Sequence, residues 1–270
     1  MPPLDDETPA RPPREAGTRE RILDAAERLF AEHGIDGVSI ARITAEAGQR
    51  NASALQYHFG TRTDLIREIF SRRMADVNRR RMEMLEGVDT LPRDGALRRI
   101  AEALVLPFAE QVDGGPDGKA YVRFTAQVYA TPGLRMWEIV RGRHDEGIRR
   151  IAALVPWFLA EIPRQVLRER LALTTTLIIH SLAERERALA ANPGPEARAA
   201  LATTTAVLID MIAGMLALPA SPGVVDALGL QPPAAVPHPT APIAAAPRAT
   251  APSAAAPRAT APSVKGEGTD

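Results

Sequence analysis

The chain has 270 residues, with 33 basic and 33 acidic side chains, 24 prolines and no cysteine. Without cysteine there are no disulfides, thiolate metal sites, iron–sulfur clusters or cysteine nucleophile, which fits a reducing, cytoplasmic compartment. The neutral balance removes the simplest sign of a nucleic-acid-binding protein, although a net charge can hide local basic patches. The acidic, proline-rich start does not resemble a signal peptide, and Asp210 interrupts the most apolar stretch, so we expect a soluble chain.

The distribution of proline divides the chain into parts. Five prolines lie in residues 1–17 and eleven in residues 219–270, where AAAPRATAPS occurs twice in tandem from Ala244. Proline-rich stretches with few large apolar residues cannot bury enough surface to offset the entropy of ordering. We therefore predict disordered segments at 1–17 and 219–270, and a folded body at 18–218. Whether the C-terminal segment is a plain tether or binds a partner stays open.

The body has long stretches of helical period and no convincing strand pattern, which predicts an all-α protein of about nine helices. Three short helices come first, with Thr18, Ser39 and Asn51 as their predicted N-caps. Each has one apolar face, formed by Ile22, Ala25, Ala26, Leu29 and Phe30 in the first, Ile40, Ile43 and Ala47 in the second, and Leu55 and Phe59 in the third.

The second and third of these helices are separated by a glycine-containing turn, as in a helix-turn-helix. The outer face of the third helix carries Ser53, Gln56 and Tyr57, whose polar groups could reach base edges in a major groove. The start of the fourth helix could bind phosphate through its free N–H groups. The pattern alone leaves open that this unit is only a helical cap packed on the body.

Residues 18–70 contain TRERILDAAERLFAEHGIDGVSIARITAEAG followed by LQYHFGTRTDLI. This stretch resembles the DNA-binding region of the tetracycline-repressor (TetR) family of transcriptional regulators. The resemblance implies a helix-turn-helix DNA-binding domain at 18–64 and an effector-binding and dimerisation domain at 65–218. The DNA-contacting residues it implies, together with the outer face described above, are Ser39, Arg50, Asn51, Ala52, Ser53, Gln56, Tyr57, His58, Thr61 and Arg62.

The chain departs from the family pattern in the turn after Ala47-Gly48, which is one residue longer than usual and lacks the usual valine. Gln56 therefore stands where the family has its phosphate-contacting tyrosine, and Tyr57 follows one place later. Leu55, His58 and Phe59 keep their spacing, so we expect the fold to be retained.

The fourth helix opens with Thr61 and Asp64 in capping-box spacing and runs to about Leu85. Five of its arginines make the helix basic and are expected on a solvated face: Arg72, Arg73, Arg79, Arg80 and Arg81. Further helices are predicted at Asp94–Val112, Lys119–Ala130, from Gly133 with an interruption around Pro156, and at Pro163–Ala191 and Glu196–Leu218.

The last two predicted helices are apolar on more than one face, so each must be buried on more than one side. The resemblance implies that they form a four-helix interface in a two-fold dimer; an ordinary intramolecular bundle is the alternative. The predicted interface residues are Leu171, Thr174, Ile178, Leu201, Leu208, Ile212 and Met215.

An effector pocket inside the body is likewise implied by the resemblance. Candidates by residue type are Tyr121, Phe124, Gln127, Val128, Trp137, Val140, Arg141, His144 and Ile178, although for any single one of them packing in the core is the favoured interpretation. Mostly apolar walls would suit a hydrophobic effector. His180 is expected to be a buried, hydrogen-bonded histidine. Arg141, Arg143, Arg149 and Arg150 are expected on a solvated face; attraction of an acidic ligand such as an acyl-coenzyme A is the alternative.

Together these features predict a ligand-responsive regulator, a repressor by preference, that binds an inverted repeat of double-stranded DNA as a homodimer. A small, largely hydrophobic effector would release it; no metal, cofactor or membrane partner is expected. The predicted DNA-binding segment is weakly basic, since residues 39–63 contain three arginines and one acidic residue, Glu46. An enzyme is disfavoured because His-Glu-x-x-His, a P-loop and Gly-x-Ser-x-Gly are all missing. A helical module that binds protein is the second alternative.

Overall fold

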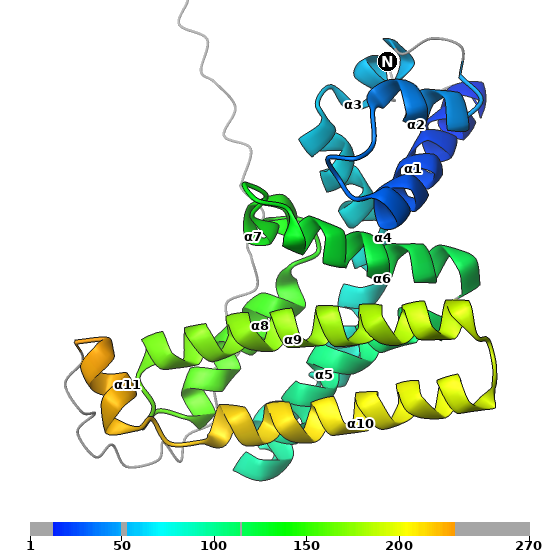
Figure 1. Cartoon of the computed structure of the whole chain (residues 1–270). Helices are drawn as coiled ribbons and strands as arrows, with labels where there is room; N and C mark the ends of the chain where they lie inside the picture. Colours follow the sequence, from blue (N-terminus) through cyan, green and yellow to red (C-terminus); the bar gives the residue numbers. More distant parts are fainter. Residues whose placement is uncertain (1–12, 50–52, 114, 230–270) are drawn as a thin grey trace, which may run out of the picture. The chain divides into compact units, whose positions relative to one another are not determined.

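The computed structural model describes residues 13–49, 53–113 and 115–229. Over these ranges the chain is all-helical, which confirms the predicted fold class (Figure 1). It forms a short 3₁₀ turn and eleven α-helices, rather than about nine. They are α1 (Pro13–His33), α2 (Ile40–Glu46), α3 (Ser53–Phe59), α4 (Arg62–Met84), the 3₁₀ turn (Val88–Thr90), α5 (Arg93–Asp113), α6 (Gly115–Ala130), α7 (Met136–Val140), α8 (Glu146–Phe158), α9 (Arg164–Ala191), α10 (Pro195–Ala217) and α11 (Pro222–Ala227).

Three helix positions differ from the prediction, and proline is involved each time. Helix α1 begins at Pro13 and α11 at Pro222, inside the two segments predicted to be disordered. Proline is well tolerated in the first turn of a helix, where its missing N–H would have no intrahelical partner. The third difference is that α7 and α8 are separate helices, and Pro156 lies in the last turn of α8 instead of interrupting it.

The first three helices pack together around the predicted apolar faces. Ile22, Phe30 and Ile43 are almost completely buried. Ser39 caps α2 as predicted, since its Oγ accepts a hydrogen bond of 3.2 Å from the Arg42 backbone N–H. Gly34 ends α1 with a φ of +77°, a left-handed conformation that glycine adopts without a Cβ clash.

A chain of aromatic contacts joins these first helices to the rest of the fold. Phe30 of α1 stacks on Phe124 of α6, with ring centroids 6.2 Å apart. Phe124 and Tyr121 of α6 flank Phe70 of α4 at 5.0 and 5.9 Å, and Tyr121 meets Phe108 of α5 at 5.8 Å. Aromatic pairs at such distances add to the stabilisation from burial. Helix α1 therefore shares its core with α4 and α6.

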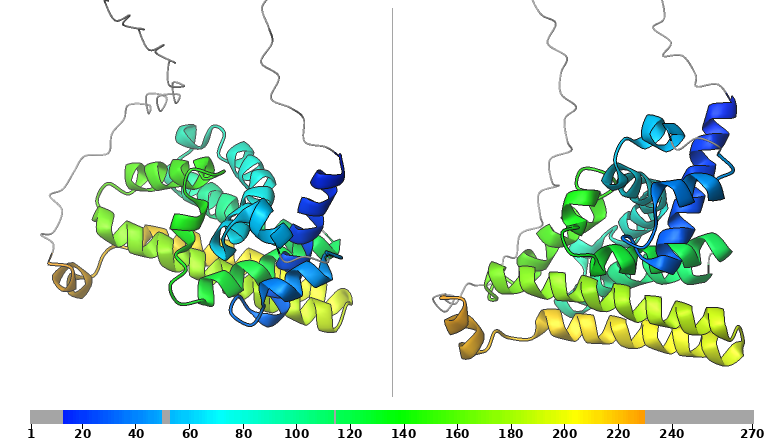
Figure 2. Two further views of the ribbon diagram at one scale, coloured as in Figure 1. Left: turned by 90° about the horizontal axis from the view of Figure 1, so that it is seen from above. Right: turned by 45° about the horizontal axis from the view of Figure 1, so that its top comes forward.

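Helices α9 and α10 run antiparallel, side by side, and α10 also packs on α5 (Figures 1 and 2). Among the described helices, α10 alone is long and apolar enough to cross a membrane by length and composition. Only 28% of that apolar window is buried within the single chain. A helix apolar on all sides needs cover on the sides left open.

Candidate nucleic-acid interface

Helix α3 is held by its inner face and leaves its outer face open. Leu55 and Phe59 are buried, and the Arg19 guanidinium lies over the Phe59 ring at 5.3 Å from its centroid. Gln56 is exposed, and Tyr57 is 74% exposed, the largest value among the exposed large apolar side chains. The outer face of α3 therefore leaves one polar and one aromatic side chain in adjacent positions open to a partner.

The N-terminus of α4 lies directly after α3 and is fixed by the predicted capping box. The Thr61 Oγ accepts from the Asp64 N–H at 3.1 Å, and the Asp64 carboxylate accepts from the Thr61 N–H at 3.3 Å. The hydrogen bond from the Thr61 hydroxyl is the main reason that the pKa of Asp64 is lowered. Arg62 turns back, and its Nη1 donates to the Ile35 carbonyl at 2.6 Å. Arg62 thereby ties α4 to the loop before α2.

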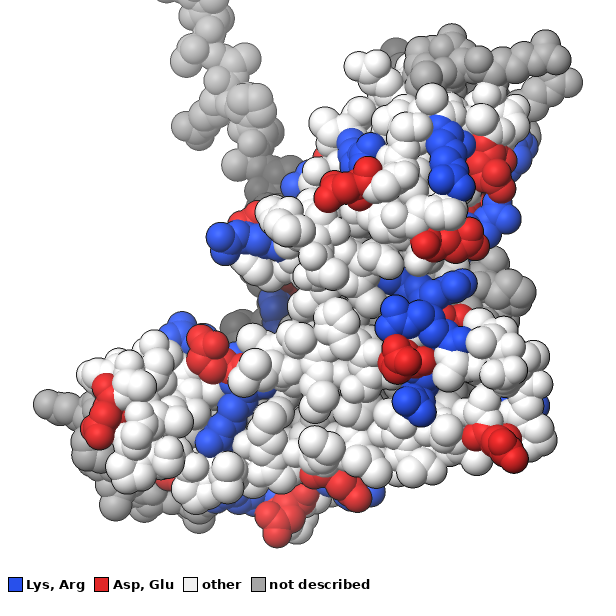
Figure 3. All heavy atoms as spheres, in the orientation of Figure 1, with Lys and Arg blue, Asp and Glu red and all other residues white. Residues whose placement is uncertain are grey.

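Charges of both signs alternate over the first helices (Figure 3). Arg28 of α1 pairs with Glu46 of α2 at 3.3 Å, and the Arg42 guanidinium lies 2.7 Å from the His33 Nε2. Because Glu46 pairs with Arg28, Arg28 adds little net positive potential here. This agrees with the weakly basic segment expected from the sequence.

Five of the ten predicted DNA-contacting residues lie within residues 56–62, where α3 ends and α4 begins. Gln56, Tyr57 and Thr61 are exposed, and His58 and Arg62 are half-buried. Ser39 lies apart as the exposed cap of α2. Residues 50–52 and the side chain of Ser53 lie outside the described residues. DNA contact by these ten residues stays a prediction.

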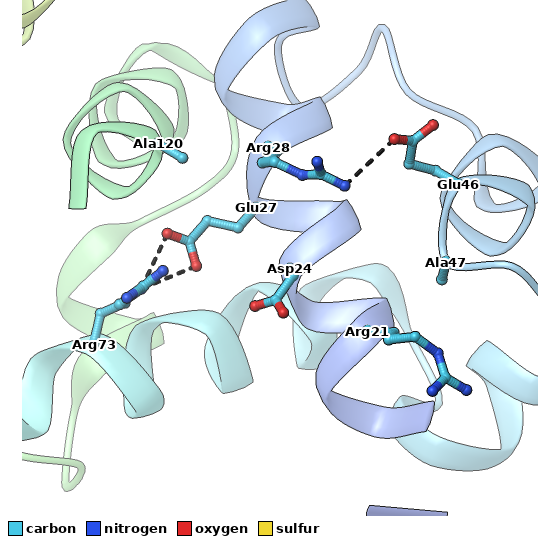
Figure 4. A pocket seen from close by; sticks show the side chains of 8 residues that line it. All are labelled: Arg21, Asp24, Glu27, Arg28, Glu46, Ala47, Arg73 and Ala120. Atoms are coloured by element: carbon cyan, nitrogen blue, oxygen red, sulfur yellow. Dashed lines mark hydrogen bonds and ion pairs between the residues drawn. The ribbon is translucent and has the colours of Figure 1, made fainter. Parts of the chain in front are cut away.

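A buried carboxylate connects α1 to α4 behind this interface (Figure 4). Glu27 is 1% exposed; it accepts from Arg72 Nη2 at 2.7 Å and from Arg73 Nε at 3.1 Å. Burial raises the pKa of Glu27 more than the two arginines lower it. A half-open polar hollow of about 330 Å³ adjoins it, lined by charged residues of α1, α2 and α4 and by Ala120 of α6.

The five arginines between residues 72 and 81 of α4 do not share one solvated face, which corrects the expectation from the sequence. Arg79 and Arg80 are exposed, but Arg72 and Arg73 pair with Glu27 and Arg81 is buried. A helix wedged between α1 and the body faces protein on several sides. Sequence reasoning missed Glu27 and Arg81. For Glu27 the sequence did contain a signal. It follows Leu23 by four residues and precedes Phe30 by three, and this spacing places it on the buried face of α1.

The nine predicted effector-pocket residues differ in burial, and their role in binding an effector stays a prediction. Tyr121, Phe124, Val128 and Ile178 are buried, and Gln127, Val140 and His144 are half-buried. Trp137 is 56% exposed with the Arg141 guanidinium 5.8 Å from its ring centroid, so that pair lies on the surface. Neither the polar hollow nor an apolar hollow of about 410 Å³ between 161–163 and 219–226 is lined by any of the nine.

The predicted dimer residues mostly face the interior of the single chain. Thr174, Ile178, Leu201, Leu208 and Ile212 are buried, whereas Leu171 and Met215 are half-buried. The outer faces of α9 and α10 instead present other apolar side chains: Leu173, Val207 and Met211. The expectation of a buried His180 was wrong. His180 is exposed because it lies two turns after Leu173 on that outer face.

Residues 22–69 match the family model described as "Bacterial regulatory proteins, tetR family", and residues 102–215 match "Tetracyclin repressor-like, C-terminal domain". The HTH-type transcriptional repressor AcnR of Corynebacterium glutamicum is 40% identical over 48 residues, which cover 18% of this chain and 25% of AcnR. The HTH-type transcriptional repressor SCO4008 of Streptomyces coelicolor is 37% identical over 60 residues, or 22% of this chain and 31% of that protein. The aligned region thus spans less than a third of either relative.

The fold is also shared with a solved structure from Shewanella sp. PV-4, a candidate tetR family transcription regulator. That structure is 16% identical in sequence, with a TM-score of 0.50, and the match covers 72% of this chain and 95% of the other. At this identity the likeness concerns the fold alone.

Proposed function

The chain belongs to the TetR family of DNA-binding transcriptional regulators, and from this premise we propose that it is a ligand-responsive repressor. We propose further that it acts as a homodimer on an inverted-repeat operator. The family is not enzymatic. We assign DNA binding to residues 18–64, and effector binding and dimerisation to residues 65–218. The exposed outer face of α3, and Tyr57 above all, is the observation that carries the DNA-reading assignment.

In this proposal helix α3 enters a major groove. Its inner face is held by Leu55 and Phe59, so Gln56 and Tyr57 can contact DNA without unpacking the fold. The free N–H groups at the start of α4, next to Thr61, can receive a backbone phosphate at the edge of the same groove. Phosphate contacts would then fix the register while α3 reads bases.

A homodimer through α9 and α10 is supported by the apolar side chains that the single chain leaves exposed. Leu173 is 62% exposed, Val207 48% and Met211 53%. The surface over α9 and α10 is largely free of charge in its central part (Figure 3). Ala206 and Gly214 are also exposed there, and their small size allows a partner helix to approach closely. A two-fold axis through this surface would present two copies of α3 to two half-sites.

Regulation would act through α4, because this helix begins at the DNA interface and ends inside the body. An effector that favours a different position of α4 would change the separation of the two α3 helices, so that they no longer fit one face of the duplex. A coupling free energy of about 1–3 kcal/mol changes DNA affinity roughly 5- to 150-fold. The effector must bind the DNA-incompetent state more tightly than the competent one.

The DNA-reading proposal is tested by selecting a binding site from random duplexes and from the promoter region of the chain's own gene. Tyr57→Ala should reduce affinity for the selected inverted repeat about tenfold or more, since a good base contact contributes about 1–3 kcal/mol. Trp137→Ala is the matched control, because it removes an exposed aromatic side chain of α7. The assignment fails if Tyr57→Ala folds, dimerises and binds the same repeat as tightly as Trp137→Ala.

A further inference from the structure

Arg81, one turn before the end of α4, is buried without a counter-ion. It is 5% exposed, and its Nε donates to the Ala103 carbonyl of α5 at 3.0 Å. Its Nη1 is buried and has no hydrogen-bond partner. No ion pair joins Arg81 to a carboxylate in the part of the chain that the structure describes. The guanidinium therefore has donors to spare inside the protein.

Such an arginine is costly to the fold. Burial lowers the pKa of Arg81 to about 10, which still leaves the side chain positively charged at neutral pH. A buried charge without a partner carries a desolvation penalty of several kcal/mol. The other buried charges have partners: Glu186 of α9, fully buried, lies 3.0 Å from Arg123 Nε, and Glu27 binds two arginines. Buried polar groups are nearly always satisfied, so the unmatched Arg81 calls for a partner from outside the chain.

The surroundings of Arg81 define what that partner would look like. Four helices meet there: α4, α5 at Ala103, α6 at Tyr121, which interacts electrostatically with Arg81, and α8 at Gly147. Tyr121 is 1% exposed and packs against Phe70 and Phe108. A ligand here would meet one positive charge beside an aromatic, apolar wall.

We propose that the effector is an amphipathic carboxylate whose negative charge pairs with Arg81 and whose apolar part packs beside the aromatic side chains of α5 and α6. This inference rests on the proposed function, because it names the ligand class of the same regulator. One guanidinium neutralises one negative charge and binds a carboxylate through two parallel hydrogen bonds. A doubly charged phosphate would bring a charge that Arg81 alone does not balance.

The position of Arg81 on α4 links such a ligand to the DNA interface. Arg73, which binds Glu27 of α1, lies eight residues earlier, about 12 Å along the helix at 1.5 Å per residue. Helix α8 covers Arg81 and is fastened to α4 through Asn78, which accepts from the Gly147 N–H at 2.8 Å and donates to Glu146 at 2.8 Å. Entry of a ligand at Arg81 would displace α8 from α4, and this repositions the helix that leads to α3.

The test measures ligand binding to the full-length protein without DNA, by thermal shift and calorimetry. The probes are hexanoate, decanoate and 4-phenylbutanoate, each compared with its uncharged primary alcohol. At least one carboxylate should raise the melting temperature of the wild type above the value with its alcohol. Arg81→Met should weaken that carboxylate at least tenfold. Arg79→Met removes an exposed arginine of the same helix and should bind like the wild type.

A second readout concerns the protein without a probe. Arg81→Met should melt at the same temperature as the wild type or higher, because an apolar side chain replaces an unpaired buried charge. If Arg81→Met fails to fold, Arg81→Lys takes its place; it keeps the charge but loses the forked donors, and should weaken the carboxylate several-fold.

The inference is overturned if no carboxylate exceeds its alcohol on the wild type, or if the Arg81 variant that folds binds as well as Arg79→Met. Operator affinity is measured separately by fluorescence anisotropy. A wild type that binds carboxylates through Arg81 but selects no operator would contradict the proposed function and leave this inference standing. A wild type that selects an operator but binds no carboxylate through Arg81 would support the proposed function and overturn this inference.

Discussion

Gly147→Ala tests whether the contact between α4 and α8 is as close as the structure makes it. A Cβ at position 147 would lie 2.8 Å from Arg81 Cδ, 2.9 Å from Asn78 Oδ1 and 3.0 Å from Arg81 Cγ. Both neighbours are buried, so neither side chain can swing into solvent. Overpacking of this kind costs about 1–3 kcal/mol. Loss of the hydrogen bond from the Gly147 N–H to Asn78 adds about 1 kcal/mol.

Helix propensity acts in the opposite direction, because alanine in a helix is favoured over glycine by about 1 kcal/mol. The net expectation is a loss of about 1–3 kcal/mol, or a melting temperature lower by roughly 2–12 °C for a domain of this size. Urea unfolding and a thermal scan measure both quantities. Gly95→Ala is the control: it lies near the start of α5, where its Cβ would meet only Leu91 Cβ at 3.9 Å, and it should be neutral or slightly stabilising. A Gly147→Ala variant as stable as Gly95→Ala would refute the reasoning.

Three further variants probe the cap, the buried carboxylate and the dimer. Thr61→Ala should cost about 1 kcal/mol in urea unfolding, as loss of an N-cap does, and an NMR titration should show the pKa of Asp64 returning toward its ordinary value, because Thr61 is the main cause of its lowering. The pKa of Glu27 is higher in the folded chain than in the unfolded chain. Glu27 therefore contributes most to folding stability below its unfolded pKa, and this contribution is lost as the pH rises through its folded pKa. The urea midpoint of Glu27→Gln should therefore rise relative to that of the wild type as the pH increases between these two pKa values. A relative fall would mean that the ion pairs of Glu27 with Arg72 and Arg73 outweigh the cost of burying its charge. Val207→Glu should give a monomer by light scattering with weakened operator binding, whereas Val224→Glu, which changes another exposed valine on α11, should remain dimeric; a dimeric Val207→Glu variant would exclude α10 from the interface.

Features that depend on neighbouring residues in the sequence were predictable. The caps at Ser39 and Thr61 and the apolar faces around Phe30 and Phe59 follow from helical spacing and from the N–H groups that a helix start leaves free. The same information located the outer face of α3, because burying Leu55 and Phe59 turns Tyr57 outward. Local rules therefore sufficed for the packing of the first helices, although α1 begins at Pro13, five residues before its predicted cap Thr18.

Features that depend on partners distant in the sequence were not predictable. Arg72 and Arg73 read as surface arginines until Glu27, some 45 residues earlier, is brought against them. On α10, and on the middle of α9 at residues 171–183, apolar side chains occur on more than one face, so hydrophobic spacing could not tell which stripe packs inside the chain. This is why Leu208 was assigned to the dimer surface and is buried, whereas Val207 beside it is exposed.

The contacts of α1 constrain how a signal could pass from the body to DNA. Helix α1 shares an aromatic core with α6 through Phe30 and Phe124, and its buried Glu27 holds two arginines of α4. Bending between the DNA-binding helices and the body would break both sets of contacts, at a cost larger than the 1–3 kcal/mol typical of allosteric coupling. The α4–α8 contact at Gly147 instead rests on one small residue and the side chain of Asn78. We therefore expect α1, α4 and α6 to move together and the rearrangement to occur where α8 meets α4.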